Sequence, residues 1–340
     1  AEDGIRDYKV TGVQTCALPI WVNTLSAQSV SITVNSVNDP PSLSVTASSP
    51  TFTEAAGLGT QAAPVQMFSG AAASTYESGQ LITGLTFTVA GVVDGASERI
   101  VVDGTTITLG GTSSGTTATN SMAYQVTSSG STYTVALSNA GGVSTANINT
   151  LINNITYQNT NTDNPTAGNR TFTITQIKDS GGTANSGVDT TTLSLPSIVN
   201  VVPVNDAPTL SSFSSAVVST NDNTEATISF SAISAKGNQA DVDGTVTAFV
   251  VQAVSAGTLR IGTSSGTATA WAAGSNDVID ASRNAYWTSA INATGTINAF
   301  TVVARDNGGL TSASAISVPV NVTDASAPTV SSLEIGRAHV

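Results

Sequence analysis

The chain has almost none of the two residue types that carry much of enzyme catalysis and of soft-metal binding. Its 340 residues include one cysteine, Cys16, and one histidine, His339. A single cysteine forms no disulfide framework and no multi-thiolate metal site. Without other histidines, the usual general base and the usual transition-metal ligand are lacking as well. These absences exclude most catalytic classes, and we expect the chain not to be an enzyme.

The two ends of the chain read differently from the rest. Residues 1–20 resemble the translation of a short-read sequencing adapter, and residues 334–340 resemble the opposite adapter. The alternative is a genuine but unusual terminal sequence. Cys16 and His339 both lie inside these segments, so residues 21–333 contain neither type. Neither end is therefore expected to contribute to the fold.

Charge is scarce and mostly negative. Only 9% of the residues are charged, and 22 acidic residues against 10 basic ones give a net charge of −12. Nucleic acids and anionic membrane surfaces both require Lys and Arg, so neither is an expected partner. No apolar run reaches the length of a membrane-spanning helix, and no export signal is evident, so any such signal is expected outside this sequence. The acidic balance favours a surface that binds cations.

The residues that are abundant favour β-structure. Thr, Val and Ile prefer the half-buried surface of a strand, and a hydrophobic content of 40% is enough for packed cores. Alternating runs between turn clusters predict strands at 85–89, 133–137, 171–174, 248–251 and 300–303. One short helix is expected at 145–155, with Ser144 as its N-cap. The pattern predicts an all-β protein of tandem Greek-key sandwiches in an elongated array.

Three related segments divide the chain. They are VNDPP at 37–41, VNDAP at 204–208 and VTDASAP at 322–328, and each follows an alternating run that predicts a closing strand, at 30–34, 198–202 and 316–322. Proline forces the residue before it out of the helical region, so the chain leaves each sandwich extended. The expected division is the last strand of a preceding repeat at 21–38, a long repeat at 39–205, a second repeat at 206–324 and the start of a further linker at 325–333.

Further motifs at set distances from these linkers carry a family resemblance. The second repeat contains ADVDG at 240–244, AYWT at 285–288 and ARDNGG at 304–309, and the long repeat contains VDGASE at 93–98, ITYQNT at 155–160 and KDSGG at 178–182. Together with the linkers, these residues resemble the tandem cadherin-like or Ig-like repeats of giant bacterial surface adhesins. The likeness covers nearly all of residues 39–324.

The resemblance implies calcium at the junctions between repeats. Calcium binds carboxylate, amide and carbonyl oxygens. At the second junction the implied ligands are Asn205, Asp206, Asp241, Asp243 and Asp306, with Glu54 and Glu98 as additional candidates. Without a metal, Asn and Asp at such positions also form turns through bonds from the side chain to the backbone, which is the competing explanation.

The first and third junctions match the pattern less fully. At the first, Asn38, Asp39 and Asp179 occupy the expected positions, but the D-x-D motif is missing and Glu77 is its only substitute. At the third, Asp324 is present, but Thr323 stands where asparagine is expected. A complete calcium cluster is therefore expected at the second junction and is in question at the first.

Two other groups of residues have a functional and a structural interpretation. Trp287 is a candidate for stacking on a sugar, as in a carbohydrate-binding module, although core packing is favoured. Asp277 and Asp280 could be a carboxylate pair for glycoside hydrolysis, but a turn is favoured.

The expected function is that of a non-catalytic, calcium-rigidified stalk or adhesion module in a secreted or surface-exposed bacterial protein. Its expected partners are neighbouring repeats of the same chain, together with glycans or other cell-surface proteins. The alternative is a carbohydrate-binding or accessory region of a larger secreted enzyme.

Overall fold

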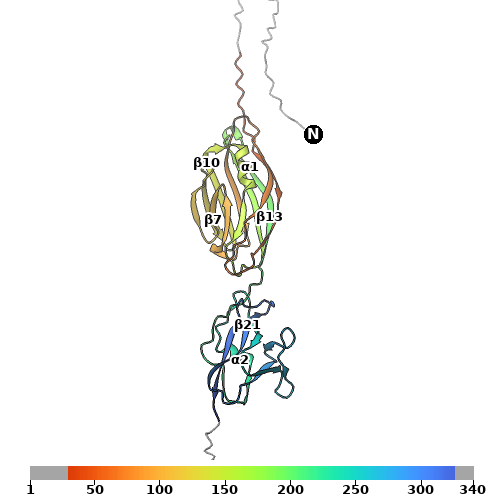
Figure 1. Ribbon diagram of the computed structural model, residues 1–340. Coiled ribbons are helices and arrows are strands. Elements are labelled where there is room, and N and C mark those ends of the chain that lie inside the picture. The colour runs from red at the N-terminus through yellow and green to blue at the C-terminus, as the bar shows by residue number, and fades with distance from the viewer. Residues whose placement is uncertain (1–29, 326–340) are drawn as a thin grey trace, which may run out of the picture. The chain divides into compact units, whose positions relative to one another are not determined.

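The computed structural model describes residues 30–325, which fold into β-sandwiches with two short α-helices (Figure 1). Two separate hydrophobic clusters form the cores, one drawn from Leu43–Val201 and the other from Leu210–Val322. Strands dominate both, so the prediction of an all-β sandwich fold is confirmed. No helix in the described range is long and apolar enough to cross a membrane.

The first sandwich consists of three sheets. A seven-stranded sheet has the order β2-β13-β12-β5-β10-β9-β8, a four-stranded sheet has the order β3-β11-β6-β7, and β1 pairs with β4. The strands are β1 (Ser42–Ala47), β2 (Thr51–Thr53), β3 (Val65–Gln66), β4 (Phe68–Ser74), β5 (Ile82–Ala90), β6 (Glu98–Val102), β7 (Thr105–Thr108), β8 (Ser113–Thr116), β9 (Ala123–Ser129), β10 (Thr132–Val143), β11 (Thr156–Asn159), β12 (Gly168–Asp179) and β13 (Thr190–Val202). Short 3₁₀ turns lie at Gly95–Ser97 and Ala184–Ser186.

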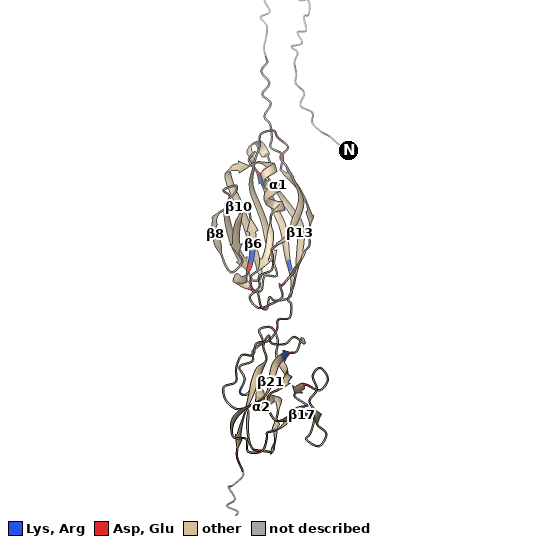
Figure 2. Ribbon diagram, in the orientation of Figure 1, with Lys and Arg blue, Asp and Glu red and all other residues tan. Residues whose placement is uncertain are grey.

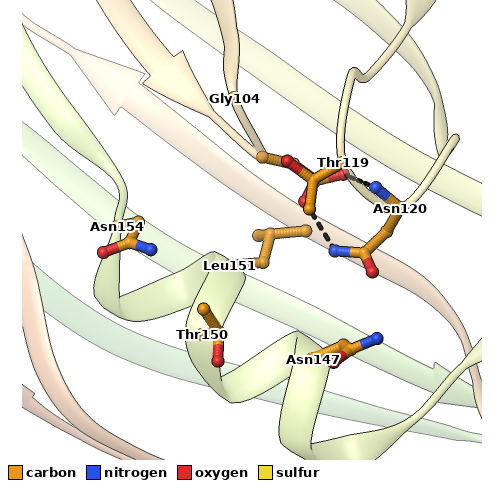
Figure 3. A pocket seen from close by; sticks show the side chains of 8 residues that line it. Gly104, Thr119, Asn120, Asn147, Thr150, Leu151 and Asn154 are labelled. Atoms are coloured by element: carbon orange, nitrogen blue, oxygen red, sulfur yellow. Dashed lines mark hydrogen bonds between the residues drawn. The ribbon is translucent and has the colours of Figure 1, made fainter.

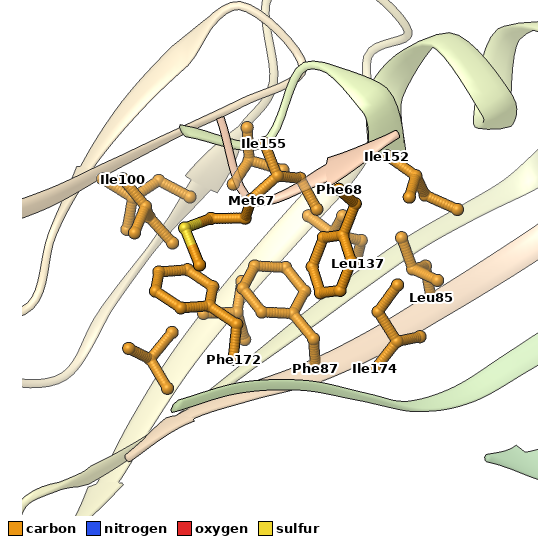
Figure 4. Close-up of a cluster of buried hydrophobic side chains, with 14 of the residues drawn as sticks. Met67, Phe68, Leu85, Phe87, Ile100, Leu137, Ile152, Ile155, Phe172 and Ile174 are labelled. Carbon is orange, nitrogen blue, oxygen red and sulfur yellow. The ribbon is translucent and has the colours of Figure 1, made fainter. Parts of the chain in front are cut away.

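Alternating side chains from the facing sheets fill the core of this sandwich (Figure 4). Phe87 of β5 and Phe172 of β12 stack with ring centroids 6.5 Å apart, and Tyr157 of β11 meets Phe172 edge-on at 6.2 Å. Burying aromatic and aliphatic side chains from both sheets supplies most of the driving force for folding. Every second residue of β5 and β10 points outward instead, and these positions are mostly Thr, Ser or Ala.

The helix α1 (Thr145–Asn153) lies between β10 and β11, as the sequence predicted for 145–155. The Ser144 hydroxyl accepts a hydrogen bond from the Asn147 backbone N–H, which confirms Ser144 as the N-cap. Ile148, Leu151 and Ile152 face the core and hold the helix against the sandwich.

The second sandwich has two sheets, with the orders β14-β22-β21-β16-β19 and β15-β20-β17-β18. Its elements are β14 (Val218–Asn221), β15 (Glu225–Ile228), α2 (Phe230–Ser234), β16 (Val246–Val254), β17 (Thr258–Gly262), β18 (Thr269–Ala270), β19 (Val278–Asp280), β20 (Asn284–Thr288), β21 (Gly295–Asp306) and β22 (Ile316–Thr323). The sequence did not predict α2, which is only five residues long and is capped by Ser229.

Both sandwiches close in the same way. A short early strand pairs in parallel with the last strand: β2 with β13 in the first sandwich and β14 with β22 in the second. The predicted closing strands at 198–202 and 316–322 are therefore confirmed within β13 and β22. Charged residues are sparse along the ribbon of both sandwiches (Figure 2).

The strand predicted at 30–34 is not formed. Val30, Ile32 and Val34 are 83–86% exposed, and no described strand pairs with this segment. Alternation predicts a strand only where a neighbouring strand and a buried face are available, and here the described residues provide neither. The two adapter-like ends, 1–20 and 334–340, lie outside the described residues, and so does the expected further linker at 325–333 apart from Ala325.

Candidate metal centre

The linker at 204–208 leads from β13 into a group of carboxylates. Asn205 donates from Nδ2 to Asp306 Oδ2 at 2.9 Å, and the other oxygen of Asp306 accepts from the Leu310 backbone N–H at 2.9 Å. Asp306 ends β21 and is buried. A Cβ on Gly308 would overlap the Asn205 side chain, so the glycine allows the linker to lie against the turn after β21.

The D-x-D motif lies beside the same linker. The Asp206 backbone N–H donates to Asp243 Oδ2 at 3.1 Å, while Asp206 Oδ1 accepts from the Gly57 N–H at 2.9 Å. A Cβ on Gly244 would overlap the side chains of Asn307 and Asp241, so glycine lets both side chains lie against the loop. The D-x-D motif therefore lies in direct contact with the linker, although 37 residues separate Asp206 from Asp243.

Glu54 reaches the linker from the end of β2. Its Oε2 accepts from the Val204 backbone N–H at 2.8 Å, and the residue is only 4% exposed. Burial raises the pKa of the Glu54 carboxyl, and the charges of Asp206 and Asp243 raise it further, against the lowering effect of the Val204 bond. The pKa of Asp241 is also raised, by burial first and then by the neighbouring Asp243 carboxylate and the charge of Asp306.

Five buried carboxylate oxygens in this group have no hydrogen-bond partner. They are Glu54 Oε1, Asp206 Oδ2, both oxygens of Asp241 and Asp243 Oδ1. Buried polar atoms in folded proteins are almost always paired, because an unpaired one loses its hydration without compensation. Half of the ten unpartnered buried side-chain atoms in the described range lie in this one group.

These carboxylates do not form a finished cage. Across residues 30–325, no group of three or more His, Cys, Asp or Glu side chains is placed so that it could hold a metal ion as it stands. The hydrogen bonds explain this, because Asp206, Asp243 and Asp306 each turn at least one oxygen toward a protein N–H group. The structure thus brings the predicted residues into one neighbourhood, with their oxygens incompletely paired.

The first junction repeats the same contacts with different residues. Asn38 donates from Nδ2 to Asp179 Oδ1 at 3.1 Å, as Asn205 does to Asp306. A Cβ on Gly181 would overlap Asn38, as one on Gly308 would overlap Asn205. The two linkers therefore enter their sandwiches through equivalent contacts.

Glu77 occupies the place of the missing D-x-D. It accepts the Asp39 backbone N–H at 2.8 Å, which is the bond that Asp243 makes to Asp206. Gln80, which no sequence motif indicated, donates from Nε2 to Asn38 Oδ1 at 2.6 Å. Its position three residues after Glu77 is the sequence feature that could have indicated a role at this junction. Glu77 Oε2, Gln80 Oε1 and Asp179 Oδ2 are buried and unpartnered.

At the third junction the structure adds Asp222, which sequence reasoning also missed. The Asp222 N–H donates to the Thr323 carbonyl at 2.9 Å, and its Oδ1 accepts from the Ala325 N–H at 3.0 Å. Glu54 makes the same pair of bonds, to Val202 and Val204. Glu54 directly follows β2 and Asp222 directly follows β14, the two strands that pair in parallel with the last strand of their sandwich. This equivalent position could have identified Asp222. Asp324, the predicted residue of this junction, lies between Thr323 and Ala325 in the sequence.

Glu98 is a correction to the predicted ligand set. Its Oε1 accepts from the backbone N–H groups of Val93 and Asp94, and its Oε2 accepts from Tyr157 Oη and Arg170 Nε, all at 2.8–2.9 Å. The side chain of Glu98 is fully buried and paired with Arg170. Four donors satisfy its two oxygens, so Glu98 joins the two sheets and is not available as a ligand at the linker.

The core-packing interpretation of Trp287 is confirmed, and its candidacy as a sugar-binding residue is corrected. Its exposed fraction is 0%, it belongs to the core of the second sandwich, and its Nε1 donates to the Ala256 carbonyl at 2.7 Å. A ring with no exposed face cannot stack on a sugar, so Trp287 is not a glycan-binding platform. The period-2 pattern of β20 could not reveal this, because the middle residues of the strand are buried on both faces.

The turn interpretation of Asp277 and Asp280 is confirmed. Asp277 accepts from the Gly274 N–H, and Asp280 pairs with Arg283 at 2.8 Å. Burial alone would raise the pKa of Asp280, but bonds from Arg283 and Ser282 outweigh it and hold the pKa at about 2. Such a carboxylate is a poor proton donor at neutral pH.

Comparisons with known proteins give no family assignment. No family model and no curated protein matches the chain. Among solved structures, the titin domains Z1Z2 in complex with telethonin align at 11% identity over 84% of this chain and 95% of that one, with a TM-score of 0.19. The Ig1-2 module of the Drosophila receptor protein tyrosine phosphatase DLAR aligns at 9% identity over 84% and 99%, with a TM-score of 0.17.

A third solved structure is the SGBP-B protein of a Bacteroides ovatus mixed-linkage glucan utilization locus, bound to a heptasaccharide. It aligns at 12% identity over 85% of this chain and 48% of that one, with a TM-score of 0.14. The strand order and register of the chain itself assign it to the all-β sandwich class.

Proposed function

We propose that the chain is a non-catalytic stalk or adhesion module of a large extracellular bacterial protein, built from cadherin-like repeats at 39–205 and 206–324 and stiffened by calcium at the linkers. The observation that carries the proposal is the group of five unpartnered, buried carboxylate oxygens at the second junction. Carboxylates that are buried together without Lys or Arg repel one another, and a divalent cation removes that repulsion.

The residues fit the donor set that calcium prefers. Calcium takes about six to eight oxygen ligands from carboxylates, amide carbonyls and backbone carbonyls. Asp206, Asp241, Asp243 and Asp306 supply carboxylates, Asn205 supplies an amide oxygen, and Glu54 supplies an oxygen from the other end of the linker. Some of these groups would exchange their present N–H partners for the ion.

The first junction is proposed as the weaker of the two sites. Glu77 replaces one carboxylate of the D-x-D motif, and Gln80 brings an amide where the second junction has charge. Affinity for calcium falls as the number of charged ligands falls. We therefore expect the second junction to fill first as the calcium concentration rises.

The mechanical consequence follows from linker entropy. Without the ion, mutual repulsion of the carboxylates favours conformations in which linker and loops separate. A bound ion would be shared by Glu54, the linker and the D-x-D loop. Fewer angles between neighbouring repeats would then remain accessible. A series of such joints would project a distal binding region away from a cell surface.

Calcium titration of the chain after chelator treatment tests the proposal. We expect heat of binding in isothermal titration calorimetry, a higher melting temperature with calcium and a narrower distribution of dimensions in small-angle scattering. Asp241→Asn combined with Asp243→Asn should weaken the tighter site at least tenfold, which corresponds to about 1.4 kcal/mol. Glu225→Gln, which removes a part-exposed carboxylate paired with Arg260 in the same sandwich, is the matched control and should bind as the wild type does. If chelation alters neither the melting temperature nor the dimensions, the calcium proposal fails.

A further inference from the structure

A small pocket lies in the first sandwich, between α1 and two turns (Figure 3). Its volume is about 220 Å³. One turn joins β6 to β7 and contains Asp103, the other joins β8 to β9 and contains Asn120, and α1 supplies Asn147, Thr150 and Leu151. None of these residues takes part in the contacts at the linkers.

The two turns are locked together by Asp103. Its backbone lies in the left-handed region, with φ of 50°, and the residue is only 4% exposed. Its Oδ2 accepts from the Thr117 hydroxyl and the Asn120 N–H, and its Oδ1 accepts from Asn120 Nδ2 at 2.6 Å. These bonds fix the orientation of the Asn120 amide, so one wall of the pocket is organised without a ligand.

The asparagines of α1 divide into two groups. Asn149 and Asn153 accept the backbone N–H groups of Ala73 and Ala71 in β4, at 2.8 and 3.0 Å, which explains their presence. The side chains of Asn147 and of Asn154, the C-cap, make no hydrogen bond within the described residues, and both line the pocket. Asn147 lies exposed in the first turn of α1, so its amide group is accessible to a ligand.

The chemistry of the lining defines the ligand class. The pocket presents amide and hydroxyl groups above Leu151, which is almost fully buried in the core, and its lining contains no Lys or Arg and one carboxylate, Asp103. Such a surface offers both donors and acceptors to neutral hydroxyl groups, while Asp103 disfavours an anionic ligand. The volume is below the range of about 300–1,000 Å³ that is usual for drug-sized ligands.

We infer that this pocket binds a single neutral saccharide residue, such as the terminal unit of a glycan. Asn120, Asn147 and Asn154 would contact its hydroxyl groups. The site is independent of the calcium proposal and would give the module a glycan-binding surface that does not use an aromatic platform.

The test uses the full chain on an array of neutral, sialylated and sulfated glycans. It is followed by saturation-transfer NMR with free glucose, galactose, mannose, fucose and N-acetylglucosamine. We expect binding to at least one neutral glycan and at least a fivefold loss of signal in the Asn147→Ala, Asn154→Ala double variant. Asn298→Ala removes an exposed asparagine of the second sandwich and should leave binding unchanged. Because both mutated positions are exposed, the double variant should melt as the wild type does.

Three results would overturn the inference. They are no binding of the wild-type chain to any neutral glycan or free sugar, a double variant that retains its signal within twofold, and a preference for sialylated or sulfated glycans over neutral ones. Failure of this test leaves the calcium titration unaffected, because the two experiments use different residues and different ligands.

Discussion

Asn205 and Asp306 are 101 residues apart in the chain and are joined by a hydrogen bond of 2.9 Å. Gly308 lies directly against this pair, because any side chain at that position would overlap the Asn205 amide. The same relationship recurs between Asn38, Asp179 and Gly181. Both junctions therefore share one arrangement, in which a glycine without a side chain leaves room for the linker asparagine.

The first prediction concerns that glycine. Gly308→Ala should destabilise the second sandwich by about 1–3 kcal/mol, since the new methyl group forces Asn205 to move. Gly266→Ala is the control, because Gly266 has an ordinary φ and no heavy atom within 4 Å of an added Cβ. Urea unfolding of both variants measures the difference. Equal free energies of unfolding for the two variants would show that the linker asparagine tolerates displacement.

The second prediction is that Asp241→Asn shifts the melting temperature in opposite directions without and with calcium. Both of its oxygens are buried and unpartnered, and its pKa is raised by burial and by the neighbouring Asp243. Asp241→Asn should therefore raise the melting temperature of the calcium-free chain, because the substitution removes a repulsive charge. In saturating calcium the same substitution should lower it, because it removes a ligand. Calorimetric melting with chelator and with calcium checks both signs, and a shift of the same sign in both conditions would contradict the ligand role.

The third prediction concerns the buried pair of Arg170 and Glu98. Arg170→Met should destabilise the first sandwich by about 3–5 kcal/mol, because it leaves the Glu98 charge buried without its partner. The double variant with Glu98→Gln should regain much of that loss. Breaking the part-exposed pair of Arg260 and Glu225 should change the stability by only about 0–1 kcal/mol.

Calcium binding provides a second readout for the same residues. Because Glu98 already accepts four hydrogen bonds, Glu98→Gln should leave calcium affinity unchanged, whereas Glu54→Gln should reduce it. Titration calorimetry distinguishes the two. A loss of affinity in Glu98→Gln alone would restore it as a ligand.

The fourth prediction is the pH dependence of the calcium-free chain. The pKa values of Glu54 and Asp241 are raised in the folded state above the ordinary values of 4.5 and 3.8. The folded state therefore binds more protons than the unfolded state in this range. Stability should rise as the pH falls from neutral toward those ordinary values, and it should be lost as the pH rises through the raised values.

Melting curves in chelator between neutral pH and about pH 4.5, the ordinary value of Glu54, measure this effect. The Glu54→Gln, Asp241→Asn double variant should lack it. A wild-type melting temperature that falls steadily over the same interval would mean that other carboxylates dominate.

Much of the fold could be predicted from short-range patterns. Alternating Thr, Val and Ile placed β5, β10, β12, β16 and β21 correctly, and Ser144 correctly marked the start of α1. Period-2 alternation is a local consequence of strand geometry and so can be read without a tertiary structure. It failed at 30–34, because a strand also needs a partner.

The candidate metal centre could be predicted in part. The linker, D-x-D and ARDNGG motifs indicated Asn205, Asp206, Asp241, Asp243 and Asp306, which the structure brings together. Gln80 and Asp222 were missed because neither belongs to a motif, and their roles depend on which turn folds back onto which linker.

The sequence by itself determined the class of the protein: an acidic, strand-rich chain divided by V-N-D linkers, with almost no cysteine or histidine. Only the tertiary structure decided how particular side chains are used. Glu98 has the chemistry of a calcium ligand, but it is buried and paired with Arg170. Trp287 has the chemistry of a sugar platform, but it is packed in the core. Residue type sets what a side chain is able to bind, whereas its partners and its exposure, which come from contacts between distant parts of the chain, set what it does bind.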